Sequence, residues 1–248
     1  MNDLEKYFEA NSGRLIHKWM HFFEVYDRHF SRYRGTDVHI LEFGVSQGGS
    51  LQMWKDYFGP KCRIYGVDIN PHCKALEEDR ITIFIGDQED RAFLKSVAAG
   101  VPRIDILIDD GGHTMRQQIA TFEEIFEHID PNGIYLCEDL HTSYWKKWGG
   151  GYRRRNTFIE YSKRFIDRIH AWHSETPLLK VDAFTRSAHS LHYYDSILVI
   201  EKRLIEAPVH AKTGIASIPD HVPPLARKGR IGRKLKRAIA RLGGRRPP

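Results

Sequence analysis

Short apolar runs separated by longer amphipathic stretches dominate most of this chain. Five runs of four to six residues, rich in Ile and Val, occur at 38–43, 63–67, 81–85, 104–108 and 133–137. Their polar and apolar positions do not alternate strictly, which is typical of strands buried on both faces of a parallel sheet. The intervening stretches 49–58, 71–78, 88–98 and 114–128 have the composition of helices. Strands that alternate with helices predict a doubly wound α/β domain.

Further elements are expected on either side of this pattern. Residues 3–33 carry aromatic and aliphatic side chains at three- and four-residue spacing, which predicts a helical segment. Beyond the fifth run, 157–172 has a helical pattern. Residues 179–185 and 194–201 are candidate strands of a hairpin at the sheet edge, with 187–190 as the connection.

The composition changes after residue 203. Four prolines in 204–226 indicate an extended linker, and 227–248 form a basic tail that is either disordered or a short amphipathic helix. We therefore expect an N-terminal helical segment over 1–36 and the α/β domain over 37–203. Residues 227–246 hold ten Lys or Arg and no acid, which leaves 28 basic and 32 acidic residues elsewhere. The net charge of +6 thus belongs to the tail.

The basic tail leaves three roles open. It is a candidate for contact with an anionic membrane surface or with nucleic acid, or it is simply a solvated tail. The chain has no apolar run of the roughly 18–20 residues that a spanning helix needs, and it begins without a secretory signal pattern. We expect a cytoplasmic protein, peripheral at the inner membrane surface if the tail binds lipid.

A glycine-rich turn follows the first predicted strand, in the sequence LEFGVSQGGS. Asp68 ends the second strand 24 residues after Gly44, where an acid can accept hydrogen bonds from ribose hydroxyls. Glu42 before the turn would repel a pyrophosphate but suits an ammonium group, so S-adenosylmethionine fits better than a dinucleotide. The expected cofactor contacts are Glu42, Gly44, Ser46, Gly48, Ser50, Asp68, Asp87, Gln88 and Asp109.

Acidic pairs follow the fourth and fifth predicted strands. Because ligands bind beyond the carboxyl ends of parallel strands, we expect Asp110, Glu138 and Asp139 to converge on Mg²⁺, with Mn²⁺ as a substitute. The metal would hold an acceptor hydroxyl pair, and His113 would act as general base. The alternative is that these acids cap helices and His113 only packs locally.

Several sequence runs carry a family resemblance, namely ILEFGVSQGGSLQMWKDYFGP, IYGVDINP, GDQED, IDDGGH and GIYLCEDLHTSYW. They resemble class I S-adenosylmethionine-dependent methyltransferases, and in particular the metal-dependent macrolide-sugar O-methyltransferases and a group labelled cephalosporin hydroxylase. The resemblance spans about residues 14–202. It implies a Rossmann-like, seven-stranded, mostly parallel sheet with an antiparallel last strand. It also assigns Asp110, Glu138 and Asp139 as metal ligands and His113 as the base.

The sequence therefore predicts a Mg²⁺-assisted O-methyltransferase that acts on a hydroxyl of a sugar or a glycosylated small molecule. His141, Tyr144 and Trp145 are candidate substrate contacts, with partly buried loop anchors as the alternative. A catechol-type phenol methyltransferase and a tail-dependent RNA methyltransferase stay open as alternative functions. Residues 1–36 can either close over the cofactor or pack against another subunit, so a homo-oligomer is a further candidate.

Overall fold

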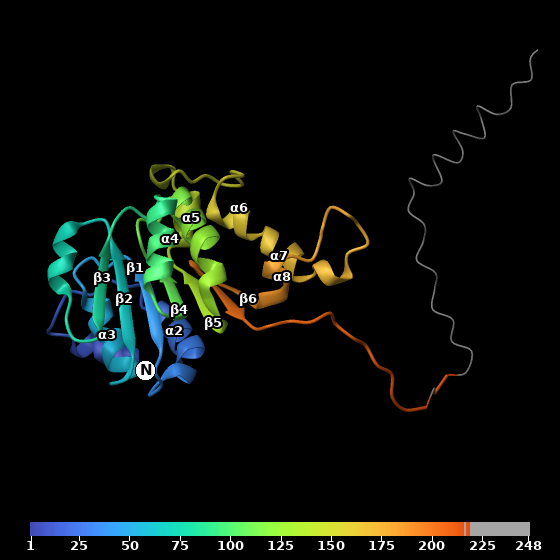
Figure 1. Ribbon diagram of the computed structural model, residues 1–248, viewed down its shortest axis with the longest axis horizontal. Helices are drawn as coiled ribbons and strands as arrows, with labels where there is room; N and C mark the ends of the chain where they lie inside the picture. The colour runs from blue at the N-terminus through green and yellow to red at the C-terminus, as the bar shows by residue number, and fades with distance from the viewer. Residues whose placement is uncertain (216, 219–248) are drawn as a thin grey trace, which may run out of the picture. The chain divides into compact units, whose positions relative to one another are not determined.

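The computed structural model describes residues 1–215, 217 and 218, and it divides into two units, 1–208 and 209–248. All described helices and strands belong to the first unit (Figure 1). The predicted basic tail, 227–248, lies outside the described residues, as does much of the predicted linker. Within the described part of the chain, no helix is long and apolar enough to cross a membrane.

Seven strands of the first unit form a single sheet in the order β3-β2-β1-β4-β5-β7-β6. Strands β1 to β5 pair in parallel, whereas β7 runs antiparallel to both β5 and β6. The predicted seven-stranded, mostly parallel sheet with an antiparallel last strand is confirmed. The strands are β1 (His39–Phe43), β2 (Arg63–Asp68), β3 (Ile81–Ile85), β4 (Ile104–Asp109), β5 (Ile129–Cys137), β6 (Ala188–Tyr194) and β7 (Ile197–Lys202).

Helices cover both faces of the sheet, as its apolar strands require. One hydrophobic core lies between the sheet and α1 to α3, and the other between the sheet and α4 to α8. Neighbouring residues of β1 serve different cores, since Ile40 belongs to the first and Leu41 to the second. The α-helices are α1 (Asp3–Ala10), α2 (Phe22–Phe30), α3 (Gly49–Phe58), α4 (Arg91–Gly100), α5 (Met115–Ile125), α6 (Phe158–Ser162), α7 (Arg164–Ile169) and α8 (Ala183–Ser187). The 3₁₀ helices are η1 (Ser31–Tyr33), η2 (Pro71–Leu76), η3 (Phe126–His128), η4 (Leu140–Tyr144), η5 (Lys146–Trp148) and η6 (Ala171–His173).

The N-terminal segment is not one helix, because its helical pattern is interrupted after α1. Asn11 ends α1 in an extended conformation, and 11–21 contain no helix before α2 begins. We call residues 11–21 the connector. The periodicity predicted helix through this stretch, although Ser12-Gly13 within it favours a break.

The strand predicted at 179–185 was wrong. Asp182 instead caps α8, where its side chain accepts a hydrogen bond from the Thr185 backbone and forms a capping box. The true hairpin strand, β6, begins at Ala188 and therefore occupies residues that the sequence pattern placed in the connection. The chain reverses at Asp195-Ser196, where Ser196 takes the left-handed conformation with φ 65°.

The turn after β1 passes unusually close to the end of β4. A Cβ atom added to Gly44 would lie 1.9 Å from the Asp110 carbonyl oxygen, and Gly44 has a φ of +95°. Only glycine combines that backbone conformation with that close approach. The contact places the glycine-rich turn directly beside the acidic residues after β4.

Gly44→Ala should therefore lower the free energy of unfolding more than Gly59→Ala. Gly59 has a similar φ of +87°, but a Cβ atom added to it would meet no atom within 4 Å, so it controls for backbone strain alone. We expect Gly44→Ala to cost at least about 2 kcal/mol more than the control in urea denaturation. Equal losses for the two variants would show that the close approach does not constrain the fold.

Candidate functional site

A cavity of about 360 Å³ opens where β1, β2 and β4 end, which is the usual ligand position in open α/β sheets. Five of the predicted cofactor contacts line it, namely Gly44, Ser46, Ser50, Asp68 and Gln88. The other four do not reach the cavity wall, namely Glu42, Gly48, Asp87 and Asp109. The connector also contributes to the wall, through Leu15 to Lys18, in line with the expectation that the N-terminal segment can close over the cofactor, although the sequence did not single out these residues.

Asp68 is held in place by the backbone around it. Its Oδ2 accepts a hydrogen bond from the Ser46 amide at 2.9 Å, and its Oδ1 accepts one from the Asn70 amide at 2.9 Å. Ser46 has a φ of 50°, so the turn after β1 bends back toward the end of β2. The carboxylate is thereby oriented at the cavity wall, with lone pairs left for a ligand hydroxyl.

Glu42 lies beneath the cavity, fully buried, and not in its wall. Its Oε2 accepts hydrogen bonds from Ser50 Oγ at 3.2 Å and Trp54 Nε1 at 3.1 Å. Its Oε1 has no partner among the described residues. Burial raises the pKa of Glu42 to about 7, although the nearby Lys18 ammonium acts in the opposite direction. Glu42 therefore supports Ser50, which does reach the cavity.

Asp109 and Gln88 form a second buried pair below the same cavity. Asp109 Oδ1 accepts a hydrogen bond from Gln88 Nε2 at 2.7 Å, and Gln88 Oε1 accepts one from the Gly112 amide at 3.0 Å. Burial raises the pKa of Asp109 to about 7, although the Gln88 hydrogen bond opposes the shift. Asp109 thus orients Gln88, which lines the cavity, but does not line the cavity itself.

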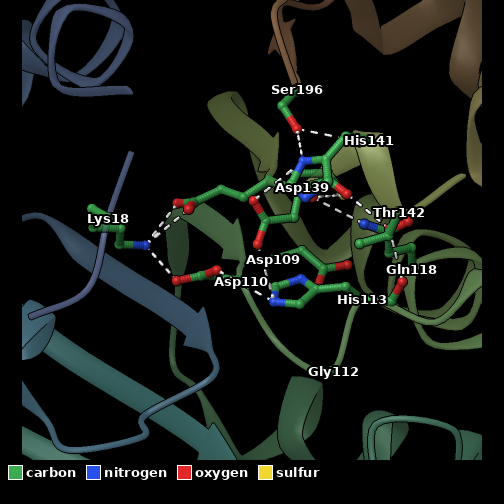
Figure 2. Close-up of polar contacts among 12 residues, drawn as sticks. Lys18, Asp109, Asp110, Gly112, His113, Gln118, Asp139, His141, Thr142 and Ser196 are labelled. Carbon is green, nitrogen blue, oxygen red and sulfur yellow. Dashed lines mark hydrogen bonds and ion pairs between the residues drawn. The ribbon is translucent and has the colours of Figure 1, made fainter. Parts of the chain in front are cut away.

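Asp110, His113 and Asp139 are partly exposed and lie close together (Figure 2), and we call these three residues together with Glu138 the acidic site. One ligand atom from each side chain lies within 4.8 Å of the others, a spacing suited to a metal ion. His113 Nε2 lies 3.3 Å from Asp139 Oδ2 and 3.8 Å from Asp110 Oδ1. His113 and Asp139 have φ values of 57° and 55°, a left-handed conformation that is uncommon for non-glycine residues.

Glu138 is adjacent to this group but has other partners. Lys18 Nζ donates to Glu138 Oε2 at 2.9 Å and to Oε1 at 3.0 Å, and Tyr26 Oη donates to Oε1 at 2.6 Å. Lys18 also donates to Asp110 Oδ2. Burial and the nearby Asp110 raise the pKa of Glu138, whereas Lys18 acts in the opposite direction. In the described structure, Lys18 thus forms ion pairs with two of the three expected metal ligands, Asp110 and Glu138.

Lys18 is the site residue that the sequence analysis missed. It lies 92 residues from Asp110 and 120 from Glu138 in the chain, within a stretch where aromatic spacing predicted only a helix. Burial disfavours its charge, yet the Asp110 and Glu138 carboxylates outweigh burial and raise the pKa of Lys18. No spacing rule connects one lysine in a connecting segment with acids at distant strand ends.

The three candidate substrate residues lie beside the acidic site. His141 Nδ1 is 3.8 Å from Asp139 Oδ1 and forms a hydrogen bond with Ser196 Oγ. The His141 ring contacts Trp145 at a centroid distance of 4.4 Å and Trp19 of the connector at 5.9 Å. Tyr144 and Trp145 are 51% and 47% exposed, so roughly half of each side chain is free to contact a ligand.

The buried Glu42 should make stability depend on pH. Because its pKa is raised from 4.5 to about 7, the folded state binds a proton that the unfolded state releases, and stability falls as pH rises through this interval. Glu42→Gln removes that loss. The stability of the variant relative to wild type should therefore increase between pH 4.5 and 7, by up to about 3 kcal/mol. Urea denaturation at a series of pH values measures this difference in the free energy of unfolding. A difference that does not change with pH would contradict a raised pKa for Glu42.

Comparisons with known proteins agree with this geometry. A methyltransferase domain family matches residues 41–140. Demethylmacrocin O-methyltransferase of Streptomyces fradiae is 37% identical over 210 residues, which cover 78% of this chain and 52% of the relative. A rhamnosyl-tetracenomycin-C 2'-O-methyltransferase of Streptomyces olivaceus is 35% identical over 190 residues, covering 72% and 49%.

A solved structure shows the same relationship. The MycE methyltransferase of the mycinamycin biosynthetic pathway, in complex with Mg and SAH, superposes with a TM-score of 0.72 at 34% identity. The match covers 82% of this chain and 54% of MycE, so the chain spans about half the length of the proteins it matches. The sheet order, the cavity beside the glycine-rich turn and these matches together place the chain among the class I S-adenosylmethionine-dependent methyltransferases, with the macrolide-sugar O-methyltransferases as its relatives.

Proposed function

We propose that this chain transfers the methyl group of S-adenosylmethionine to a hydroxyl of a sugar or a glycosylated small molecule, with the help of Mg²⁺. The observation that carries the proposal is that the expected cofactor contacts and the acidic residues line the same cavity. The cavity wall that holds Asp68 and Ser46 also contains Asp110, His113 and Asp139. A cofactor bound along this wall would therefore place its reactive end beside the acidic group.

The donor set of the acidic group fits a hard divalent cation. Asp110 and Asp139 offer carboxylate oxygens, the ligands that Mg²⁺ and Mn²⁺ prefer. Asp139 Oδ1 is buried and has no hydrogen-bond partner among the described residues, so it retains capacity for a ligand. A cation bound there would lower the pKa of an acceptor hydroxyl.

His113 is the candidate general base. Its Nε2 lies close to both carboxylates, His113 lines the cavity, and a neutral imidazole can accept a proton on a ring nitrogen. It would take the hydroxyl proton on a ring nitrogen while the hydroxyl oxygen bonds to the cofactor's methyl carbon and the carbon–sulfur bond breaks. The neighbouring Asp139 carboxylate would stabilise the imidazolium that forms.

A second cavity of about 400 Å³ provides room for the rest of the acceptor. It begins at His141, next to Asp139, and its further lining is Leu140, Tyr144, Ile159, Lys163, Ile166, Tyr193, Tyr194, Asp195 and Ser196. Aromatic and aliphatic walls of this kind suit an apolar portion attached to a sugar. The names of the two relatives describe O-methylation of a rhamnosyl tetracenomycin-C and of demethylmacrocin, and the first of these favours a glycosylated acceptor here.

The proposal predicts separable losses from three variants. Asp68→Ala should weaken S-adenosylmethionine binding at least about tenfold in calorimetry, because an acceptor for ligand hydroxyls is lost. Asp139→Asn should retain the cofactor and lose Mn²⁺ binding. His113→Gln should retain the cofactor and lower kcat about 10²- to 10⁴-fold on a glycoside acceptor.

Exposed residues of the same types provide matched controls. Asp79→Ala and His128→Gln remove an exposed acid and an exposed histidine away from the cavities, and both should leave binding and turnover unchanged. Failure of the wild type to bind S-adenosylmethionine would contradict the whole proposal. Faster methylation of simple catechols than of any glycoside would retain the chemistry and overturn the acceptor class.

A further inference from the structure

The connector places a lysine inside the acidic site. The Lys18 side chain is 3% exposed, and its ammonium donates to Asp110 Oδ2 and to both oxygens of Glu138. Figure 2 shows the Lys18 ammonium beside Asp110, on the side away from His141. Since Lys18 belongs to residues 11–21, one side chain ties the connector to the ends of β4 and β5.

Lys18 already satisfies the carboxylates that a cation would bind. Glu138 Oε2 accepts from Lys18, and Oε1 accepts from both Lys18 and Tyr26. Asp110 Oδ2 accepts a hydrogen bond from Lys18, whereas Asp110 Oδ1 lies on the side of His113. Asp139 forms no ion pair with Lys18 within the described structure, so the charge of the acidic site is balanced unevenly.

Space for an exchange of cations exists beside the lysine. A cavity of about 110 Å³ is lined by Lys18 and Trp19 of the connector together with Asp110, Glu138 and Asp139. A water molecule occupies about 30 Å³ in the liquid, so this volume suits an ion with bound water or a displaced ammonium. The three acids therefore surround a space that both the Lys18 ammonium and a divalent metal ion can reach.

We infer that Lys18 is a tethered cation that competes with the divalent metal for the carboxylates of the acidic site and so weakens metal binding. The inference rests on the proposed function only in placing the metal at these acids. A positive charge about 3 Å from the ligand oxygens repels a divalent ion, and at this short range the repulsion exceeds the effect of distant surface charges. To bind the oxygens of Glu138 and Asp110 that Lys18 contacts, the metal must displace the Lys18 ammonium from them.

Displacement of Lys18 would also affect the connector. Leu15, Ile16 and His17 line the cofactor cavity, and Trp19 lies edge-on to His141. When the metal binds, the connector loses its ion pairs to Asp110 and Glu138. The connector should therefore become easier to open as the metal site fills.

The experiment is a Mn²⁺ titration of the full chain, followed by electron paramagnetic resonance of the free ion. Lys18→Met, which removes the charge but retains an unbranched side chain, should bind Mn²⁺ about tenfold more tightly than wild type, or better. Lys18→Arg retains the charge and should stay near the wild-type affinity. Lys55→Met is the matched control, because Lys55 also donates to a glutamate, Glu78 Oε1 at 2.9 Å, but away from the acidic site.

The outcomes separate this inference from the proposed function. Unchanged or weaker Mn²⁺ binding by Lys18→Met overturns the role of Lys18 and leaves the metal site in place. Absence of Mn²⁺ binding from both wild type and Lys18→Met overturns the metal site itself, and the inference with it.

If Lys18→Met does not fold, a measurement on the wild-type protein tests the same inference. Amide hydrogen exchange across residues 14–20 should become faster on addition of Mn²⁺, while exchange within α5 stays unchanged. Slower exchange across the connector would mean that the metal strengthens its attachment. That result would overturn the inference.

Discussion

Parallel pairing of β1, β4 and β5 is the constraint on which the candidate site depends. Phe43 of β1 pairs with Asp109 of β4, and Asp109 pairs with Cys137 of β5, so the three strands end at the same level. Gly44, Asp110 and Glu138 each follow these ends directly. Three loops that are far apart in the chain therefore meet at one edge of the sheet.

This convergence creates an electrostatic problem as well as a binding site. Buried Glu138 and the partly exposed Asp110 and Asp139 would repel one another without a cation nearby. The described structure provides the Lys18 ammonium next to Asp110 and Glu138, and Lys18, Asp110 and Asp139 all line the first cavity. A single edge of the sheet thus combines a buried ion pair, between Lys18 and Glu138, with a carboxylate oxygen, Asp139 Oδ1, that has no hydrogen-bond partner among the described residues.

Much of the architecture follows from local patterns in the sequence. The five apolar runs match β1 to β5, since strands covered by helices on both faces must be apolar on both sides. The residue pattern failed where local hydrogen bonds outweighed it, as at Asp182, whose capping box starts α8 within a predicted strand. It also failed in the connector, where helical periodicity continued through residues that the structure leaves without a helix.

By itself, the sequence determined the doubly wound fold and the family resemblance, and it placed the two acidic clusters at strand ends. These features depend on residue order and short spacing, which a single chain displays directly. Only the tertiary structure decided that Glu42 and Asp109 lie beneath the cavity, and that Lys18 reaches across 120 residues to Glu138. The physical reason is that burial and long-range ion pairs arise from packing between distant segments, which no local pattern specifies.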